Sequence, residues 1–152
     1  MEITFDMNEM RYVVGVDFGD GQKVPAHQHP KGGGWVAETA HVDDDCFVGP
    51  FAGVYGEARV TDGAIINDYA KVFGNALVYG NAKVYGDARV YDLAQVYGNA
   101  RVSGYAEVYE NSRVLDNALV YDNAKIRGNS IVRNNSEVFN DATISGDADI
   151  YD

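Results

Sequence analysis

The sequence predicts an all-β fold in which very short strands wind into a solenoid. Three features of the 152-residue chain predict it: an aliphatic residue at every sixth position, a small residue two positions earlier, and a pair of turn-forming residues in each interval. The aliphatic positions run from Val36 to Ile150, and all twenty are Val or Ile. An amphipathic helix needs apolar spacings of three and four residues, which this stretch lacks.

Each six-residue unit predicts one short strand and one tight turn, as in 82–87 (Ala-Lys-Val-Tyr-Gly-Asp). Residues two apart on a strand point to the same side, so the small and the aliphatic residue both face inward. Nineteen small positions hold fifteen Ala, three Ser and Cys46, which predicts a narrow interior and an inert, buried thiol. Gly, Asn and Asp fill the turn positions because they tolerate a left-handed backbone.

This pattern resembles the hexapeptide-repeat proteins, which form left-handed, triangular, single-stranded parallel β-helices. The resemblance covers residues 36–152 and has no interruption. It implies 18 residues per coil, six to seven coils and a left hand; the general crossover rule alone favours the right hand.

The first 35 residues break the repeat and predict a small N-terminal β cap, so we expect a cap over 1–35 and a solenoid over 36–152. Residues 3–5 and 12–16 have the composition of short strands. A solenoid must cover its first coil, and we expect Trp35 to pack over that open end. The role of residues 24–31 is open.

This lead-in is similar to that of the YdcK-type hexapeptide proteins of bacteria and prophages. The shared motifs are an Asp-Phe-Gly-Asp turn at 17–20 and a Gly-Gly-aromatic-aliphatic step at 33–36. Members of that group are commonly labelled acyltransferases by analogy of fold.

With 18 residues per coil, the outward residues just after each aliphatic position stack in three columns. They include aromatic residues that predict stacked ladders, either as stiffening or as a surface for oligomers or partners. These candidate interface residues are Tyr55, Phe73, Tyr91, Tyr109, Tyr79, Tyr97, Tyr85 and Tyr121. The turn residues Asn81, Asn99, Asn117 and Asn135 also share a column, which predicts a ladder of hydrogen bonds between their side-chain amides.

The chain carries 23 acidic and 12 basic residues, for a formal net charge of -11. This excess disfavours direct binding to nucleic acid or to an anionic membrane. A single Cys excludes a disulfide framework within the chain, and no apolar run of membrane-spanning length occurs. The N-terminal stretch is acidic and lacks the apolar segment of a secretory signal, so we expect a cytoplasmic protein.

All three histidines lie near the N-terminus: His27, His29 and His41. His41 is the one candidate for a catalytic base on the solenoid, as the resemblance to hexapeptide acyltransferases implies. Those enzymes usually work as trimers with acyl-CoA between two solenoids, and a loop commonly interrupts their repeats. The three histidines are also weak candidates for a zinc site, but a complete ligand set is lacking, so we expect no metal.

We therefore expect a non-catalytic, self-associating solenoid that acts as a scaffold or binding module, with an origin in phage or prophage as an open question. We expect no cofactor, and a homo-oligomer: a trimer, as the resemblance implies, or an end-to-end dimer through the C-terminal coil. A protein partner is also possible. Two alternatives stay open: an acyl-CoA-dependent acyltransferase with a site between subunits, for which acetyl-CoA would be the cofactor, and an acidic DNA-mimic inhibitor.

Overall fold

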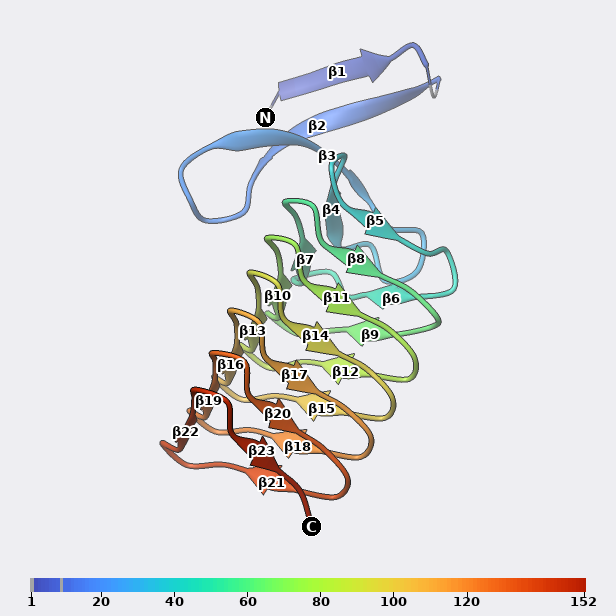
Figure 1. The fold of residues 1–152 in the computed structure, drawn as a ribbon. Coiled ribbons are helices and arrows are strands. Elements are labelled where there is room, and N and C mark those ends of the chain that lie inside the picture. The colour runs from blue at the N-terminus through green and yellow to red at the C-terminus, as the bar shows by residue number, and fades with distance from the viewer. Residues whose placement is uncertain (1, 9) are drawn as a thin grey trace.

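Three sheets wound around one core make up the solenoid in the computed structural model, which describes residues 2–8 and 10–152 (Figure 1). Strands of successive coils pair in parallel with a shift of 18 residues, as Lys71 pairs with Arg89 and Val72 with Val90. The six-stranded sheet contributes one strand to each of six coils. The all-β class, the three-sided parallel solenoid and the number of coils are therefore as the sequence predicts.

The strands of the solenoid are two residues long, apart from the first, and each coil contributes one strand to each face. The ten-stranded face contains β4 (Trp35–Ala37), β7 (Gly53–Val54), β10 (Lys71–Val72), β13 (Arg89–Val90), β16 (Glu107–Val108), β19 (Lys125–Ile126) and β22 (Thr143–Ile144). The seven-stranded face contains β5 (His41–Val42), β8 (Arg59–Val60), β11 (Leu77–Val78), β14 (Gln95–Val96), β17 (Arg113–Val114), β20 (Ile131–Val132) and β23 (Asp149–Ile150). The six-stranded face contains β6 (Phe47–Val48), β9 (Ile65–Ile66), β12 (Lys83–Val84), β15 (Arg101–Val102), β18 (Leu119–Val120) and β21 (Glu137–Val138).

The interior is filled by the two inward positions of each unit. The aliphatic residues from Val48 to Val132 and the Ala residues from Ala58 to Ala124 are fully buried, and only the end coils expose part of theirs. Cys46 and Ser112 occupy small positions and are fully buried as well. Burial raises the pKa of the Cys46 thiol, which agrees with the expected inert role.

The corners require a left-handed backbone at one residue of each turn. Gly74 has a φ of 64°, and Asp92, one coil further on, has a φ of 58°. Side chains that occupy this position also bond to the next coil: a carboxylate oxygen of Asp92 accepts a hydrogen bond from the backbone N–H of Glu110 at 3.1 Å. The turn residues thus determine the backbone conformation of the corner and also form hydrogen bonds between adjacent coils.

The adjacent turn position holds the Asn column. Each amide donates to the carbonyl oxygen of the next Asn, and the three bonds that join Asn81, Asn99, Asn117 and Asn135 are 3.3 Å long. The predicted ladder is therefore present at this corner.

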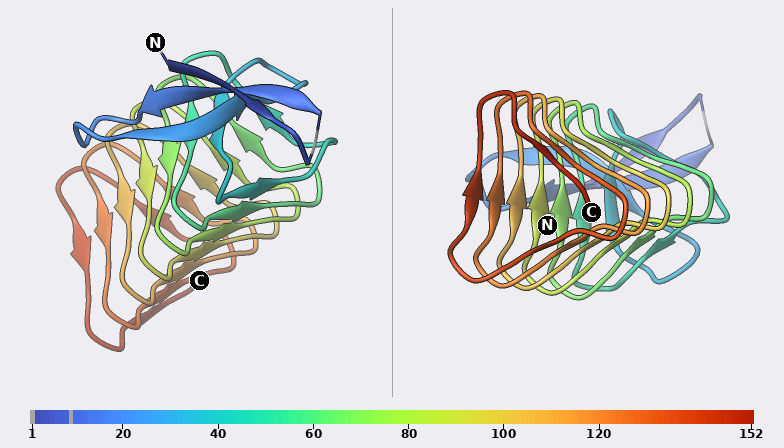
Figure 2. Two further views of the ribbon diagram at one scale, coloured as in Figure 1. Left: turned by 90° about the horizontal axis from the view of Figure 1, so that it is seen from above. Right: turned by 60° about the horizontal axis from the view of Figure 1, so that its bottom comes forward.

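The cap is an antiparallel extension of the ten-stranded face (Figure 2). It consists of β1 (Glu2–Asp6), β2 (Arg11–Asp17) and β3 (Lys23–Gln28), and β3 pairs with β4. The predicted strands at 3–5 and 12–16 are present, whereas β3 had no predicted strand, so residues 24–31 gain a structural role there. Because β4 belongs to both parts, the boundary between 35 and 36 stays a prediction.

Trp35 does not cover the open end of the solenoid, which corrects our expectation. It lies on the outer side of β4, where it joins a second apolar cluster with Phe18, Ala26 and Ala37. Trp35 and Val36 are adjacent on a strand and must point to opposite sides, and Val36 takes the inward side.

The loop at 29–34 covers the first strand of the six-stranded face instead. The backbone N–H of Gly34 donates to the Val48 carbonyl at 2.9 Å. A Cβ at Gly34 would lie only 2.2 Å from the carbonyl oxygen of Gly49, so the loop can approach the first coil this closely only with glycine there.

We predict that Ala82→Leu destabilises the fold by about 1–3 kcal/mol, because the narrow interior beside the corner has no space for the added side chain. The matched control is Lys83→Leu, whose side chain points outward on β12. Urea unfolding followed by circular dichroism measures both variants. Equal stability of Ala82→Leu and the wild type would contradict the close packing described above.

Candidate functional site

An aromatic ladder runs along the ten-stranded face. Neighbouring rings of Tyr55, Phe73, Tyr91 and Tyr109 lie 4.8, 4.9 and 5.0 Å apart between centroids, with interplanar angles of at most 4°. Phe18 of the cap adds a fifth ring, 4.5 Å from Tyr55. Each ring covers its neighbours, so the four predicted rings are half-buried. The ladder contributes stacking energy to the coils and also joins the cap to the solenoid.

Glu107 fixes one hydroxyl of this ladder. The Tyr91 hydroxyl donates to a carboxylate oxygen of Glu107 at 2.7 Å. Burial and this hydrogen bond raise the pKa of Tyr91 far above its ordinary value. Tyr91 therefore stays protonated at physiological pH and acts as a hydrogen-bond donor within the ladder.

The other two predicted columns are shorter. Tyr79 and Tyr97 stack at 4.7 Å on the seven-stranded face, and Tyr121 stacks on Phe139 at 5.5 Å on the six-stranded face. Ser103 separates Tyr85 from Tyr121, and the hollow there has a volume of about 280 Å³. Seven of the eight predicted interface residues thus stack on another ring: six on a member of the same set, and Tyr121 on Phe139. Among the described residues, Tyr85 has no stacked ring.

Three strongly exposed rings lie at one corner of the solenoid, where sequence reasoning did not place any. Phe51, Tyr69 and Tyr105 are 67%, 58% and 66% exposed, and Phe51 stacks on Tyr69 at 5.4 Å. They occupy the turns between the six-stranded and the ten-stranded face, at intervals that are multiples of 18. The same spacing rule, applied to turn residues as well as strand residues, would have found them.

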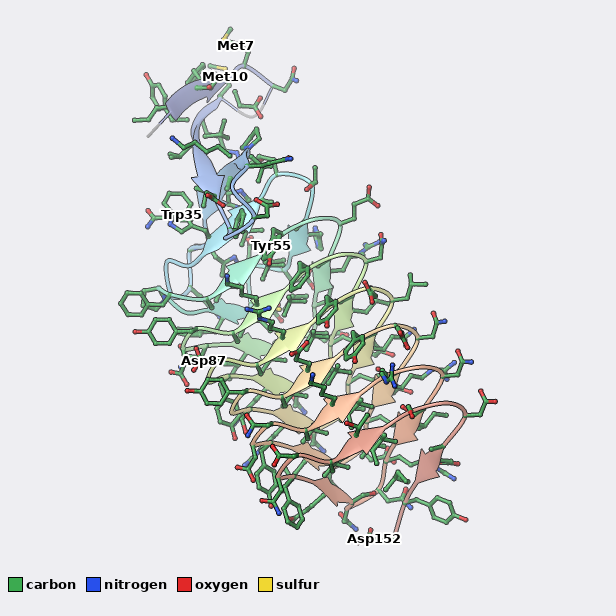
Figure 3. The ribbon with its side chains drawn as sticks, turned by 90° about the vertical axis from the view of Figure 1, so that its left-hand side faces the viewer. Met7, Met10, Trp35, Tyr55, Asp87 and Asp152 are labelled. Carbon is green, nitrogen blue, oxygen red and sulfur yellow. The ribbon has the colours of Figure 1, made fainter. Side chains whose placement is uncertain are left out.

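We call this column the corner ridge. From the first coil to the last, its members are Phe51, Tyr69, Asp87, Tyr105, Asn123 and Asp141. Figure 3 shows Asp87 at one edge of the ten-stranded face and Tyr55 over the middle of that face. The corner ridge and the aromatic ladder are therefore separate features.

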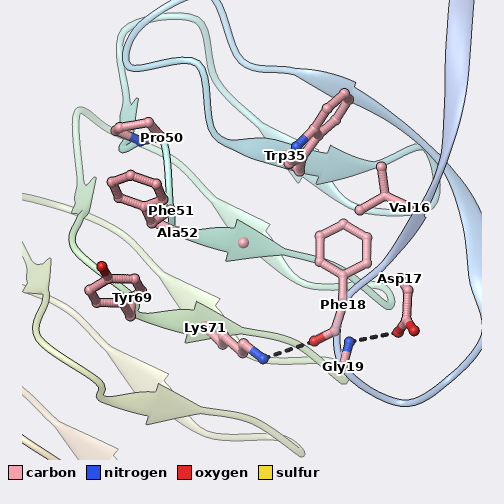
Figure 4. A pocket seen from close by; sticks show the side chains of 11 residues that line it. Val16, Asp17, Phe18, Gly19, Trp35, Pro50, Phe51, Ala52, Tyr69 and Lys71 are labelled. Carbon is pink, nitrogen blue, oxygen red and sulfur yellow. Dashed lines mark hydrogen bonds between the residues drawn. The ribbon is translucent and has the colours of Figure 1, made fainter. Parts of the chain in front are cut away.

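A hollow of about 340 Å³ lies where the cap meets the ridge (Figure 4). Trp35, Phe51 and Tyr69 are among its aromatic lining residues. The Lys71 ammonium donates to the carbonyl oxygen of Phe18 at 2.8 Å, which ties the cap loop to β10. The hollow combines aromatic walls with one cation that already has a protein partner.

His29 has a structural position and is nearly fully buried. Its Nε2 lies 2.8 Å from the carbonyl oxygen of Cys46, and since a carbonyl can only accept, Nε2 carries the proton. In later coils a backbone N–H fills this role, as when Lys83 donates to the carbonyl of Ala100. The imidazole therefore replaces the backbone donor that a preceding coil would supply.

The other two histidines each contact a carboxylate. His27 Nδ1 lies 2.6 Å from Glu38, which also pairs with Arg11, and His41 Nε2 lies 2.7 Å from Asp43. Within residues 2–8 and 10–152, no group of three His, Cys, Asp or Glu side chains is arranged to hold a metal. The structure does not bring the three histidines together.

His41 is exposed on the seven-stranded face, and Asp43 follows it two residues later on the same side. The hydrogen bond from His41 is the largest cause that lowers the pKa of the Asp43 carboxyl. A histidine oriented by a carboxylate has the arrangement of a general base. The aromatic hollow lies on another face, so the two features do not form one site.

Many of the cations and many of the carboxylates occupy different positions on the prism, although Glu107, Glu137 and Asp149 also stand at outward strand positions. Cations stand at outward strand positions, and many carboxylates stand at the left-handed turn positions. The first group includes Arg59, Lys71, Lys83, Arg89, Arg101, Arg113 and Lys125, and the second includes Asp62, Asp68, Asp92, Glu110, Asp116 and Asp122. The surface therefore has acidic corners and faces that carry cations.

One comparison with known proteins gives a match. A family model described as the YdcK beta solenoid repeat matches residues 94–110. Neither a curated protein nor a solved structure matched the chain. The chain thus carries the YdcK-type repeat, and the structure shows a hexapeptide-repeat β-solenoid, as the resemblance implied.

The described part of the chain contains no helix that is long and apolar enough to span a membrane.

We predict that His29→Ala lowers the free energy of unfolding by about 1–3 kcal/mol, because the buried Cys46 carbonyl loses its donor. The control is His41→Ala, which removes an exposed side chain and should change stability by less than about 0.5 kcal/mol. Chemical denaturation measures both. Equal stability of His29→Ala and the wild type would refute the capping role.

We also predict that His41→Ala raises the pKa of Asp43 toward its ordinary value, since the lowering hydrogen bond is lost. In the wild type the lowered pKa means that Asp43 contributes its stabilisation above its unfolded-state pKa and loses it as the pH falls through its folded-state pKa. Carbon-13 NMR titration of the carboxyl measures this pKa. An unchanged Asp43 titration in the variant would show that His41 does not hold it.

Proposed function

We propose that the chain is a non-catalytic, self-associating β-solenoid that serves as a scaffold or a protein-binding module. The observation that carries this proposal is the corner ridge, where three large rings are more than half exposed. Exposed aromatic rings gathered along one edge of a protein typically mark a contact with another protein. The half-buried ladder on the ten-stranded face adds a flat, rigid surface beside it.

Rigidity supports the scaffold function. The repeat continues from Val36 to Ile150 without an inserted loop, and loops are where catalytic groups are usually placed. The coils are joined by hydrogen bonds of the backbone, of the turn carboxylates and of the Asn ladder. A rod of this kind holds surface groups at fixed intervals. Contact through the C-terminal coil and a trimer both remain predictions.

One observation favours the acyltransferase alternative. His41 is exposed and hydrogen-bonded to Asp43, so its ring is oriented and accessible to a substrate. In that alternative, His41 would remove a proton from the acceptor while acyl-CoA bound between subunits. The large aromatic surfaces on the other faces would then have no part in the reaction.

The DNA-mimic alternative rests on the net charge of -11. A mimic of the phosphate backbone needs columns of negative charge facing a cationic groove. Here the acidic corners alternate with faces that carry Arg and Lys, which weakens that field. We therefore rank this alternative below the other two.

We predict that the wild-type protein forms oligomers whose fraction rises with concentration between about 10 and 500 µM, the range expected of a small interface. Sedimentation velocity measures the oligomer fraction at each concentration.

We also predict that acetyl-CoA does not raise the melting temperature of the protein, whereas a ligand that binds the folded state would raise it.

A protein that stays monomeric over the whole range would refute the scaffold proposal. A rise in melting temperature with acetyl-CoA that disappears in His41→Ala would instead support the acyltransferase. Competition with DNA for a basic DNA-binding protein would support the mimic.

A further inference from the structure

Large and small side chains follow one another along the corner ridge in an order that lets two antiparallel copies of the ridge fit together. From the first coil to the sixth, its residues are large, large, small, large, small, small: Phe51, Tyr69, Asp87, Tyr105, Asn123 and Asp141. Read backwards, every large residue meets a small one and every small residue meets a large one. A column with this property can pair with a second copy of itself in an antiparallel arrangement.

A vacant place in the ridge shows where such pairing would centre. Successive coils lie about 4.8 Å apart, so the rings of Tyr69 and Tyr105 are separated by about 10 Å across Asp87. One aromatic ring fits between two others at this separation, since stacked centroids lie about 4.5–7 Å apart. The hollow beside Asp87 has a volume of about 490 Å³, and Tyr69 and Tyr105 line it.

We propose that two copies of the chain associate through their corner ridges about a twofold axis, with the solenoid axes antiparallel and Tyr105 of each copy inserted beside Asp87 of the other. This inference rests on the proposed self-association and specifies its surface and register. The rings of both copies then form one stack in the order Phe51, Tyr69, Tyr105 of the partner subunit, Tyr105, Tyr69 of the partner subunit and Phe51 of the partner subunit.

The sizes select one register. In it, Tyr69 faces Asn123 of the partner subunit and Phe51 faces Asp141 of the partner subunit. A shift by one coil in one direction places Tyr105 against Tyr105 of the partner subunit. A shift in the other direction places Tyr69 against Tyr105 of the partner subunit. Both shifts bring two rings into the same place, so sterics exclude them.

The backbone at the twofold axis allows a close approach. The residues that precede Asp87 and Tyr105 in their turns are Gly86 and Gly104, with φ values of 66° and 64°. In the proposed register these two glycines face each other across the axis. No side chain at this level would keep the two corners apart.

Charges also match next to the ridge. Arg89 and Glu107 stand on the ten-stranded face at the levels of Asp87 and Tyr105, and both line the same hollow. The twofold axis places Arg89 opposite Glu107 of the partner subunit, and the reverse pair forms by symmetry. Each inserted Tyr105 hydroxyl can donate to the carboxylate of Asp87 on the other copy, which satisfies it on burial. The same register brings Lys71 of one copy to the level of Lys125 of the partner subunit, and these two side chains have like charges. The Lys71 ammonium is held away from this contact by its hydrogen bond to the Phe18 carbonyl.

The contact spans six coils, which is on the order of 25 Å, and it is narrow because two corners meet. Its area lies at the low end of specific interfaces, which predicts a weak or transient dimer. The experiment therefore uses sedimentation velocity on the full chain up to about 500 µM.

Tyr105→Ala removes the inserted ring and Asp87→Tyr fills the slot. We expect each variant to raise the dimer dissociation constant at least tenfold. The matched control is Leu93→Ala, which removes a side chain that is 56% exposed at an equivalent turn of another corner, and we expect a change of less than twofold. Circular dichroism confirms that each variant folds.

If the wild type dimerises and both Tyr105→Ala and Asp87→Tyr dimerise with the same dissociation constant, this inference is overturned and the proposed self-association still stands. A wild type that is monomeric throughout would overturn both.

A spin-label distance tests the register independently. Asp141→Cys in a Cys46→Ala background carries one label per chain, at the last level of the ridge. The antiparallel register separates the two labels by five coils, about 24 Å along the axis. A label separation below about 15 Å would indicate parallel pairing and would contradict the proposal.

Discussion

The narrow interior is the constraint on which the rest of this structure depends. Only a small residue and an aliphatic residue face inward in each unit, and both are buried throughout the central coils. Close packing tolerates neither a larger side chain nor an inserted residue there. The chain is therefore held to six residues per unit from Val36 to Ile150, and each coil lies in register on the last.

Strict register converts sequence spacing into surface chemistry. Any two residues that are 18 apart lie one above the other, so a column of like residues becomes a ladder: Asn amides bond along one corner and Tyr rings stack along one face. Strict register also means that a small residue within a column of large residues leaves a gap of defined size and position. Asp87 in the corner ridge and Ser103 between Tyr85 and Tyr121 are such exceptions, and each lines a hollow. The surface features of this protein follow from where its repeat is regular and where it is not.

The sequence was sufficient to predict the solenoid, because each unit repeats the same local rule and tertiary packing agrees with it. It was also sufficient for the ladders of Tyr55 and Tyr79, since spacing alone determines which rings stack. The cap was harder: β3 contains Pro25 and lies outside the repeat, so the pattern that identifies the other strands does not mark it, although it forms a local antiparallel pair with β4. Likewise, the capping role of His29 follows from the position of the Cys46 carbonyl, which no local pattern reveals. The corner ridge was missed although its spacing is visible, because the Asn column was the one column of turn residues that the sequence analysis followed from coil to coil.

The packing of inward valines tests the account most directly. Methyl nuclear Overhauser effects in a protein with labelled Val and Ile report which side chains touch. The account predicts contacts between residues 18 apart, such as Val84 with Val102, together with contacts between successive units of one coil. Contacts at spacings of three and four, or inward valine methyls that exchange magnetisation with water, would contradict it.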